Sequence, residues 1–160
     1  MFNTTIATQI YAKICFEATN SQKKIIENLS EYLSDDDFSR IFVLNGFAGT
    51  GKTTLIAAVV AALKELRIKP VLLAPTGRAA KVLARYCGEQ ALTIHKRIYR
   101  QRTNADYESK FSLDFNREQG AVFIVDEASM LSDSTGDGAL FGSGSLLEDL
   151  VSYVRSGRGC

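Results

Sequence analysis

The sequence has no cysteine pair, no long hydrophobic run and almost no net charge, and each absence argues against a class of protein. Its three cysteines, Cys15, Cys87 and Cys160, are far apart in the chain and form no Cys-x-x-Cys motif. Neither a zinc site nor a disulfide framework is therefore indicated, and reduced thiols in a cytoplasmic protein are the simplest interpretation. No hydrophobic run reaches transmembrane length, and no basic segment followed by an apolar one opens the chain, so we expect neither a membrane span nor a secretory signal.

Charge and composition describe an ordinary globular protein. The 19 Lys and Arg residues and 18 Asp and Glu residues leave a formal net charge of +1. No global field favours nucleic acid, so any such binding must use a local patch. The 160 residues are 46% hydrophobic, which is enough for one domain with a buried core.

Residues 46–53 read Gly-Phe-Ala-Gly-Thr-Gly-Lys-Thr and match the phosphate-loop pattern, in which the second of two glycines five residues apart precedes Lys and a hydroxyl residue. Glycines let the backbone curl so that successive N–H groups point at phosphate oxygens. Lys52 supplies a charge that can reach the β- and γ-phosphates, and the Thr53 hydroxyl can ligate magnesium. The predicted nucleotide-binding residues in this stretch are Gly46, Ala48, Gly49, Thr50, Gly51, Lys52, Thr53 and Thr54.

The setting of this loop strengthens the match. Residues 41–44, Ile-Phe-Val-Leu, form an apolar run typical of a buried strand, and residues 54–66 carry apolar side chains at helical spacing. The dipole of that helix would place its positive end at the loop. A strand, a loop and a helix in this order are the setting that a phosphate loop requires, whereas an incidental glycine-rich turn requires neither element.

Elsewhere the chain alternates between helix and strand signals. Helices are expected at residues 3–16, 19–33, 76–86, 94–99 and 146–154, and strands at residues 71–74 and 121–125, with a weaker one at 111–115. This alternation predicts an α/β fold with a parallel sheet and flanking helices. We assign residues 1–40 to N-terminal helices and residues 41–160 to the α/β domain.

Three segments that carry functional side chains follow predicted strands. They are the phosphate loop, Pro75 with Thr76, and Asp126 with Glu127. Because ligands of parallel sheets bind at the carboxyl ends of the strands, we expect these segments at one edge. Asp126 can hold magnesium through water, since magnesium dehydrates reluctantly, and Glu127 can orient and deprotonate an attacking water.

Basic residues gather in two places. Arg78, Lys81 and Arg85 share one face of the helix expected at residues 76–86, and a denser cluster occupies residues 95–102. The helix face fits either a solvated surface or a stripe that contacts nucleic-acid phosphates.

Five segments together resemble superfamily 1 DNA helicases of the RecD-like and Dda-like branch, the type of the exodeoxyribonuclease V alpha subunit. The phosphate loop is similar to motif I of that branch, and Ala-Pro-Thr-Gly-Arg-Ala-Ala at residues 74–80 is similar to its motif Ia. Thr-Ile-His at residues 93–95 resembles motif Ib, and Val-Asp-Glu-Ala-Ser-Met at residues 125–130 resembles motif II. Gln22 resembles the glutamine that reads adenine, and the five segments occur in the order of the family.

The resemblance implies the first part of a RecA-like phosphate-loop motor domain, which hydrolyses ATP with Mg²⁺ while it moves along single-stranded DNA. Lys52 and Thr53 would bind phosphate and magnesium, Asp126 would hold magnesium, and Glu127 would be the catalytic base. The residues expected along the DNA path are Pro75, Thr76, His95 and, from the basic helix face, Arg78.

The sequence also departs from that family. The Gly-Asp…Gln strand, the arginine finger and the second motor domain do not follow motif II, and in RecA-like folds the missing strand lies between the phosphate-loop strand and the Asp-Glu strand. We therefore expect a truncated sheet that a C-terminal motor domain or another chain completes, strands that rearrange, or a domain of marginal stability. We also expect these 160 residues alone to bind ATP weakly and to turn it over slowly or not at all.

Two other functions fit the phosphate loop. A small-molecule kinase would need an acceptor site and a lid with arginines, for which residues 100–119 are the candidate segment, although Asp-Glu-Ala-Ser at residues 126–129 fits a hydrolase better. A non-catalytic nucleotide-binding module would bind ATP without turnover. Stimulation of ATP hydrolysis by single-stranded DNA would separate a helicase from a kinase.

Overall fold

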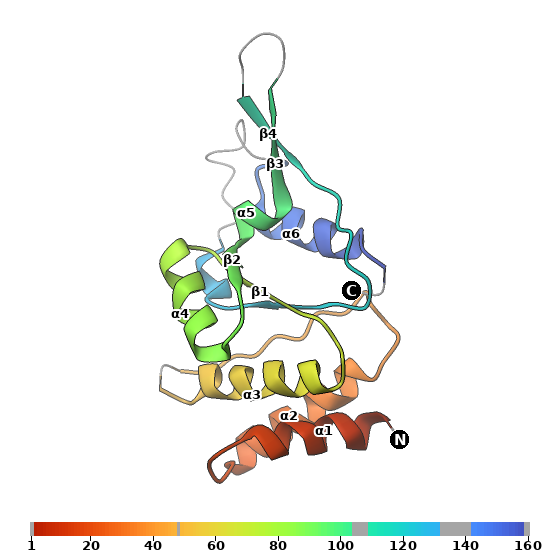
Figure 1. The fold of residues 1–160 in the computed structure, drawn as a ribbon, viewed down its shortest axis with the longest axis vertical. Coiled ribbons are helices and arrows are strands. Elements are labelled where there is room, and N and C mark those ends of the chain that lie inside the picture. Colours follow the sequence, from red (N-terminus) through yellow and green to blue (C-terminus); the bar gives the residue numbers. More distant parts are fainter. Residues whose placement is uncertain (1, 48, 104–108, 132–141, 159–160) are drawn as a thin grey trace. The chain divides into compact units, whose positions relative to one another are not determined.

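The computed structural model describes residues 2–47, 49–103, 109–131 and 142–158 (Figure 1). The chain divides into two compact units. We call them the helical unit, Met1–Pro70 with Arg85–Gly88, and the sheet unit, Val71–Ala84 with Glu89–Cys160. Within the described residues, no helix combines the length and the apolar character needed to cross a membrane. Of the cysteines that the structure describes, Cys15 and Cys87 form no disulfide.

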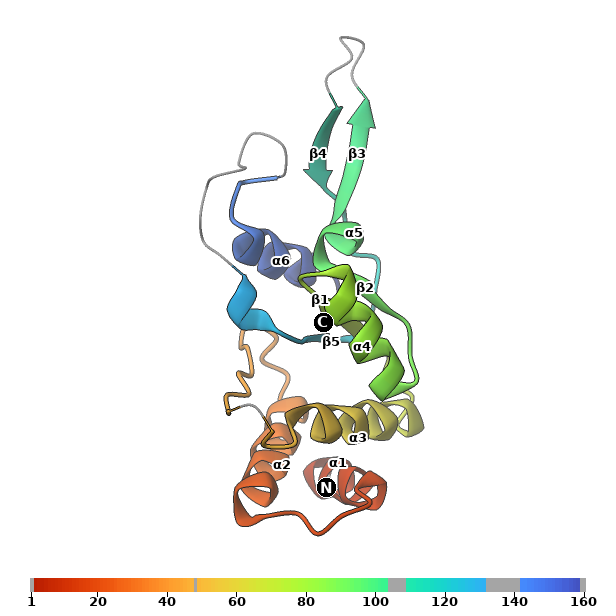
Figure 2. The ribbon, with the colours of Figure 1, turned by 90° about the vertical axis from the view of Figure 1, so that its left-hand side faces the viewer.

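Three helices build the helical unit: α1 (Phe2–Lys13), α2 (Asn20–Leu33) and α3 (Lys52–Glu65). α1 packs against both α2 and α3 (Figure 2). Their apolar spacing predicted all three helices, and that prediction is confirmed. The side chains that this spacing buries are at most 5% exposed and include Ile6, Ile10, Ile26, Leu55, Val59, Val60 and Leu63.

The chain between α2 and the phosphate loop does not form the predicted strand. Residues 41–44 have no strand conformation, and the side chains of Ile41 and Val43 are 61% and 79% exposed. A strand is held by hydrogen bonds to a neighbouring strand, and neither described sheet includes this segment. The prediction of a buried strand here is wrong, because an apolar run with no partner strand stays irregular.

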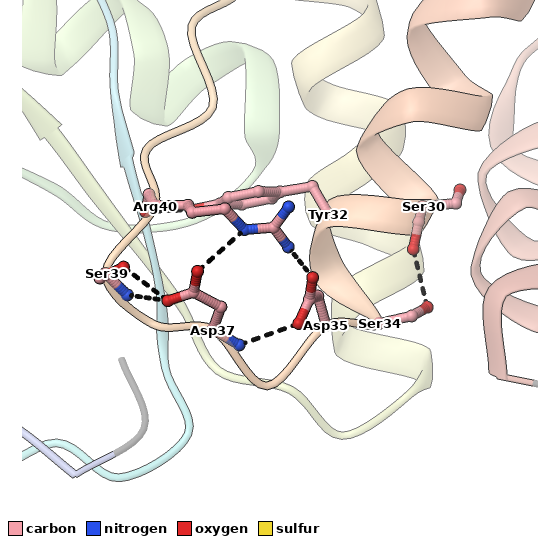
Figure 3. A network of polar contacts seen from close by, with 7 residues as sticks. All are labelled: Ser30, Tyr32, Ser34, Asp35, Asp37, Ser39 and Arg40. Carbon is pink, nitrogen blue, oxygen red and sulfur yellow. Dashed lines mark hydrogen bonds and ion pairs between the residues drawn. The ribbon is translucent and has the colours of Figure 1, made fainter.

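A polar network precedes that segment (Figure 3). Arg40 forms ion pairs with Asp35 and Asp37, and its guanidinium carbon lies 5.8 Å from the centroid of the Tyr32 ring. The Tyr32 hydroxyl in turn donates a hydrogen bond of 3.1 Å to the Arg40 carbonyl. Hydrogen bonds from Ser39, with the charge of Arg40 as a smaller contribution, hold the pKa of Asp37 below its usual value. Arg40 therefore connects the turn that contains Asp35 and Asp37 to Tyr32 at the end of α2.

The sheet unit contains a three-stranded parallel sheet in the order β2-β1-β5. Its strands are β1 (Pro70–Ala74), β2 (Ala91–Thr93) and β5 (Val122–Val125), and α4 (Gly77–Cys87) connects β1 to β2. The central strand β1 is buried over its last four residues, and its Ala74 pairs with Thr93 of β2. The strands predicted at residues 71–74 and 121–125 and the helix predicted from residue 76 are confirmed, as is the parallel sheet.

An antiparallel hairpin extends the sheet unit. α5 (Ile94–Ile98) leads directly into β3 (Tyr99–Thr103), and β3 pairs with β4 (Ser109–Leu113) (Figure 2). α6 (Leu146–Arg155) packs against α5. The sequence did not predict β2 or β3, because β2 has three residues and β3 reads Tyr-Arg-Gln-Arg-Thr without an apolar alternation. The buried residues of this unit's core are Val71, Leu73, Ile94, Ile98, Tyr99, Ala121, Leu150 and Tyr153.

Candidate functional site

A hollow of about 730 Å³ lies within the helical unit, between the phosphate loop and the start of α2. Its volume is in the range of small-molecule and cofactor sites. The predicted nucleotide-binding residues that line it are Gln22, Gly46, Gly49, Thr50, Gly51, Lys52 and Thr54. Of the other predicted residues, Thr53 is half-buried in the first turn of α3 and is not among the lining residues, and Ala48 lies outside the described residues.

Two glycines give the phosphate loop its curl. Gly49 has φ +78° and Gly51 has φ +81°, in the left-handed region that a side chain disfavours. Gly51 is also the N-cap of α3, and its carbonyl accepts a hydrogen bond of 2.9 Å from the N–H of Leu55. The first N–H groups of a helix have no partner within the helix, and the positive end of its dipole favours anions. The loop therefore leads into a helix start that suits phosphate.

Side chains of the loop bond to carbonyl groups of the loop itself. The Lys52 ammonium donates to the carbonyl oxygens of Gly46 and Phe47, the latter at 2.7 Å. The Thr50 hydroxyl donates to the same Phe47 carbonyl at 2.8 Å. These bonds fix the curl of residues 46–52 and keep the lysine charge beside the loop, where the sequence predicted it would act.

Gln22 joins the start of α2 to this loop. Its Oε1 accepts a hydrogen bond of 3.0 Å from the Thr19 N–H, and the Thr19 hydroxyl oxygen accepts one of 3.3 Å from the Gln22 N–H, which completes a capping box. Its Nε2 donates to the Thr50 carbonyl at 3.4 Å. The helix predicted over residues 19–33 thus begins with a side-chain cap at Thr19. The resemblance alone assigned Gln22 to the nucleotide, and the structure places it on the wall of the hollow.

The sequence analysis missed several other residues of the hollow. The segment between α1 and α2 contributes an aromatic ring, that of Phe16, which is 38% exposed, and the carboxylate of Glu17. Ile25 of α2 and Leu55 of α3 add apolar wall. No motif in the sequence singled out these residues, because their place in the wall depends on how α1 packs against α2 and α3.

Asp126 and Glu127 lie at the carboxyl edge of the parallel sheet. The Asp126 N–H bonds to the carbonyl of Leu73 at 3.0 Å, which aligns the end of β5 with the end of β1. Glu127 has φ +54°, an uncommon value for a residue with a side chain, and caps the short 3₁₀ helix Ala128–Met130. Asp126 is half-buried, and its Oδ1 accepts a hydrogen bond of 3.0 Å from the Glu127 N–H. The two carboxylates thus occupy different environments at one edge.

The predicted DNA-contacting residues Pro75, Thr76 and His95 lie at the same edge. Pro75 and Thr76 follow β1, and His95 is the second residue of α5, which begins directly after β2. The Thr76 hydroxyl oxygen accepts a hydrogen bond of 3.2 Å from the Ala79 N–H, so it also starts α4. The His95 ring packs beside that of Tyr99 at a centroid distance of 5.7 Å. The expected convergence is therefore observed for the segments of the sheet unit.

The two basic groups differ in their pairing. Within the dense cluster, Arg97 forms an ion pair with Glu118, and Arg100 forms one with Asp114 at 2.6 Å. On α4, by contrast, the side chains at positions 78, 81 and 85 are exposed, and none of them makes an ion pair with another described residue. Among the described residues, no group of three or more His, Cys, Asp or Glu side chains could hold a metal by itself.

Comparison with known proteins supports the resemblance found in the motifs. A protein-family model described as an AAA domain matches residues 17–140. The chain is 30% identical over 114 residues to the ATP-dependent RecD2 DNA helicase of Deinococcus radiodurans, a match that covers 71% of this chain and 15% of that protein. It is 37% identical over 92 residues to the ATP-dependent DNA helicase dda of Enterobacteria phage T4, covering 54% of this chain and 20% of that protein.

Both matches span a small part of these relatives, at most a fifth of their length. The family model, which matches residues 17–140, contains the segments in which the five motifs were found. The resemblance to the RecD-like and Dda-like branch is thereby confirmed, and the chain belongs to the AAA domain family.

Proposed function

We propose that this chain is the ATP-binding part of a DNA-dependent ATPase of the helicase type, which couples ATP hydrolysis to movement on single-stranded DNA. The observation that carries the proposal is the hollow beside residues 46–54. It combines two left-handed glycines, a lysine and the start of a 14-residue helix in one wall. Such a wall suits the phosphates of a nucleotide, and the remaining volume suits its base and sugar.

The proposal assigns one set of residues to the phosphates and another to the metal. Gly49, Thr50 and Gly51 offer backbone N–H groups to the β- and γ-phosphates, and Lys52 adds a charge there. Thr53 and Asp126 are the residues that would hold Mg²⁺, since magnesium prefers hydroxyl, carboxylate and water oxygens. A bound Mg²⁺ would neutralise charge that develops on the phosphates during hydrolysis.

Glu127 is proposed as the general base. Its exposed carboxylate stands directly after the half-buried Asp126, and its backbone has a left-handed φ of +54°. One carboxylate can then hold the metal while the other accepts a proton from water. Strain at a residue with positive φ persists only where the surrounding structure maintains it, which is common at active sites.

Single-stranded DNA is the proposed polymer partner. Pro75, Thr76 and His95 line the carboxyl edge of the sheet, and Arg78 stands exposed in the first turn of α4. The names of both relatives describe DNA helicases. This similarity favours the helicase function over the small-molecule kinase that the phosphate loop alone allowed.

Two measurements on this chain test the proposal. Isothermal titration should detect weak binding of ATP that strengthens with Mg²⁺, and hydrolysis should be slow or absent. Any measured hydrolysis should rise when single-stranded DNA is added. Failure to bind ATP at millimolar concentration would contradict the proposal, and phosphorylation of a small-molecule acceptor would favour the kinase.

A further inference from the structure

We propose that Phe16 is the residue on which the base of the bound nucleotide stacks, while the phosphates lie against residues 49–52. The inference rests on the proposed function of the phosphate loop, and it adds a contact that none of the five motifs contains. It implies that this side chain lets the hollow distinguish a nucleoside triphosphate from an inorganic polyphosphate.

The charged side chains among the described lining residues differ in sign between two parts of the wall. Lys52 stands at the start of α3, where its charge and the unpaired N–H groups of the first helical turn suit a triphosphate. Glu17 comes from the segment between α1 and α2, and its carboxylate would repel a phosphate chain beside it. The wall therefore favours a ligand with its phosphates at Lys52 and an uncharged group at residues 16–17.

Phe16 offers such an uncharged group a flat apolar surface. Its ring lines the hollow and is 38% exposed. A base laid on this ring would remove apolar surface from water on both partners. Ile25 and Leu55 add further apolar wall to the same hollow. This surface suits a heterocyclic ring, whereas a phosphate would lose its water there without gaining a hydrogen bond.

The cap of α2 holds the segment that carries Phe16. Phe16 precedes Thr19 by three residues, and two reciprocal hydrogen bonds join Thr19 to Gln22 at the start of the helix. These bonds fix the chain where it enters α2. Ordering this segment therefore adds little to the free-energy cost of binding a ligand.

A second aromatic ring among the described lining residues is that of Phe47. Phe47 belongs to the phosphate loop, and its carbonyl accepts hydrogen bonds from the Lys52 ammonium at 2.7 Å and from the Thr50 hydroxyl at 2.8 Å. Its backbone is thus bonded to the lysine that binds phosphate in the proposed function. Phe47 accordingly belongs with the phosphate part of the wall, which leaves Phe16 as the ring for the base.

Ligands with and without a base test the inference. Isothermal titration would measure the affinities of Mg²⁺-ATP and Mg²⁺-tripolyphosphate for the wild-type chain and three variants. Phe16→Ala should lower the affinity for ATP on the order of tenfold and leave that for tripolyphosphate unchanged, because only ATP has a ring to stack. Phe16→Tyr, which keeps an aromatic ring, should bind ATP as the wild type does, whereas Phe16→Leu should not.

Fluorescence provides a second measurement, because the 160 residues contain no tryptophan. Phe16→Trp places a single indole in the hollow, and ATP should change its emission while tripolyphosphate leaves it nearly unchanged. Phe38→Trp is the matched control, since Phe38 is an exposed aromatic residue of the same unit that does not line the hollow. Its emission should respond to neither ligand.

Three results would contradict these expectations in different ways. An equal loss of affinity for ATP and tripolyphosphate in Phe16→Ala would overturn the inference, because it would show that Phe16 acts on the structure of the hollow and not on the base. A response to ATP in Phe47→Trp without one in Phe16→Trp would also overturn it and assign the base to Phe47. A wild-type chain that binds neither ligand would instead contradict the proposed function.

Discussion

The Nζ atom of Lys52 lies 2.7 Å from the carbonyl oxygen of Phe47, within the loop that it follows in the sequence. The same ammonium also donates to the Gly46 carbonyl. A phosphate oxygen would offer this group a charge-assisted hydrogen bond, which is roughly twice as strong as a bond to a neutral carbonyl. Exchange of the carbonyl partners for phosphate is therefore favourable, and the lysine does not have to travel far to make it.

Lys52→Ala should lower the affinity for Mg²⁺-ATP by about tenfold to hundredfold, because a hydrogen bond to a charged group contributes about 1.5–3 kcal/mol. Isothermal titration of the variant and the wild-type chain measures this change. Lys64→Ala, in the last turn of the same helix, is the matched control and should bind as the wild type does. Equal affinities in all three proteins would show that Lys52 takes no part in binding.

Gly51→Ala should disturb both the stability and the binding of the helical unit. A side chain at φ +81° costs about 1–2 kcal/mol, and the new Cβ would stand 3.1 Å from Nε2 of Gln22. Urea denaturation and ATP titration would measure the two losses. Gly77→Ala is the control, because Gly77 begins α4, has no atom within 4 Å of an added Cβ and should tolerate alanine without loss.

Glu127→Gln should separate binding from chemistry. The amide keeps the size of the side chain but cannot accept a proton from water, so ATP affinity should stay within about twofold while hydrolysis falls by about 10²- to 10⁴-fold. The measurement belongs in a protein in which this chain is joined to a second motor domain, where turnover is large enough to follow. Hydrolysis at the wild-type rate would remove Glu127 from the role of base.

Local signals predicted much of the fold. Apolar side chains at helical spacing located α1, α2, α3 and α6 because a helix buries a face that its own sequence defines. Thr19 and Thr93 were recognisable as caps, since a hydroxyl that bonds the N–H three residues later needs no distant partner. β1 was recognisable because four apolar residues in a row suit a strand buried on both faces.

Features that depend on distant parts of the chain were not predictable in the same way. Residues 41–44 have the composition of a strand, but a strand exists only when another strand pairs with it. The contact between Gln22 and Thr50 spans 28 residues, and only the family resemblance, which assigns Gln22 to the nucleotide that the loop binds, connects the two segments. Of the candidate site, the loop could therefore be predicted from its motif, whereas the wall formed by Phe16 and Glu17 could not.

The exposure of residues 41–44 can be tested by replacing isoleucine with alanine at one exposed and one buried position. Ile41→Ala should change the free energy of unfolding by less than about 0.5 kcal/mol, because the Ile41 side chain is 61% exposed. Ile26→Ala should cost about 2–5 kcal/mol, because Ile26 is fully buried in α2. Chemical denaturation of both variants measures the difference. A large loss in Ile41→Ala would mean that this segment is packed in solution.

The hydroxyl of Tyr99 donates a hydrogen bond of 2.6 Å to Asp149, a carboxylate that is only 6% exposed. The Ser143 N–H donates to the same oxygen at 3.0 Å, so one buried charge ties β3, α6 and the segment before α6 together. A Cβ added at Gly142 would clash with that carboxylate, which shows how closely the backbone at residue 142 approaches it. Tyr99→Phe would leave Asp149 with one donor fewer and should cost about 1–3 kcal/mol of stability, whereas Tyr86→Phe, at an exposed tyrosine, should cost almost nothing.

The same pair predicts how stability depends on pH. Burial, and then the hydrogen bond to Asp149 and its charge, raise the pKa of Tyr99 well above the ordinary value of 10. The folded state therefore holds a proton that the unfolded state loses near pH 10, so this contribution to stability is complete below pH 10 and declines as the pH rises above it. Denaturation midpoints from pH 8 to pH 11 should fall more steeply at the alkaline end for the wild type than for Tyr99→Phe. Parallel curves for the two proteins would show that the Tyr99 proton is not linked to folding.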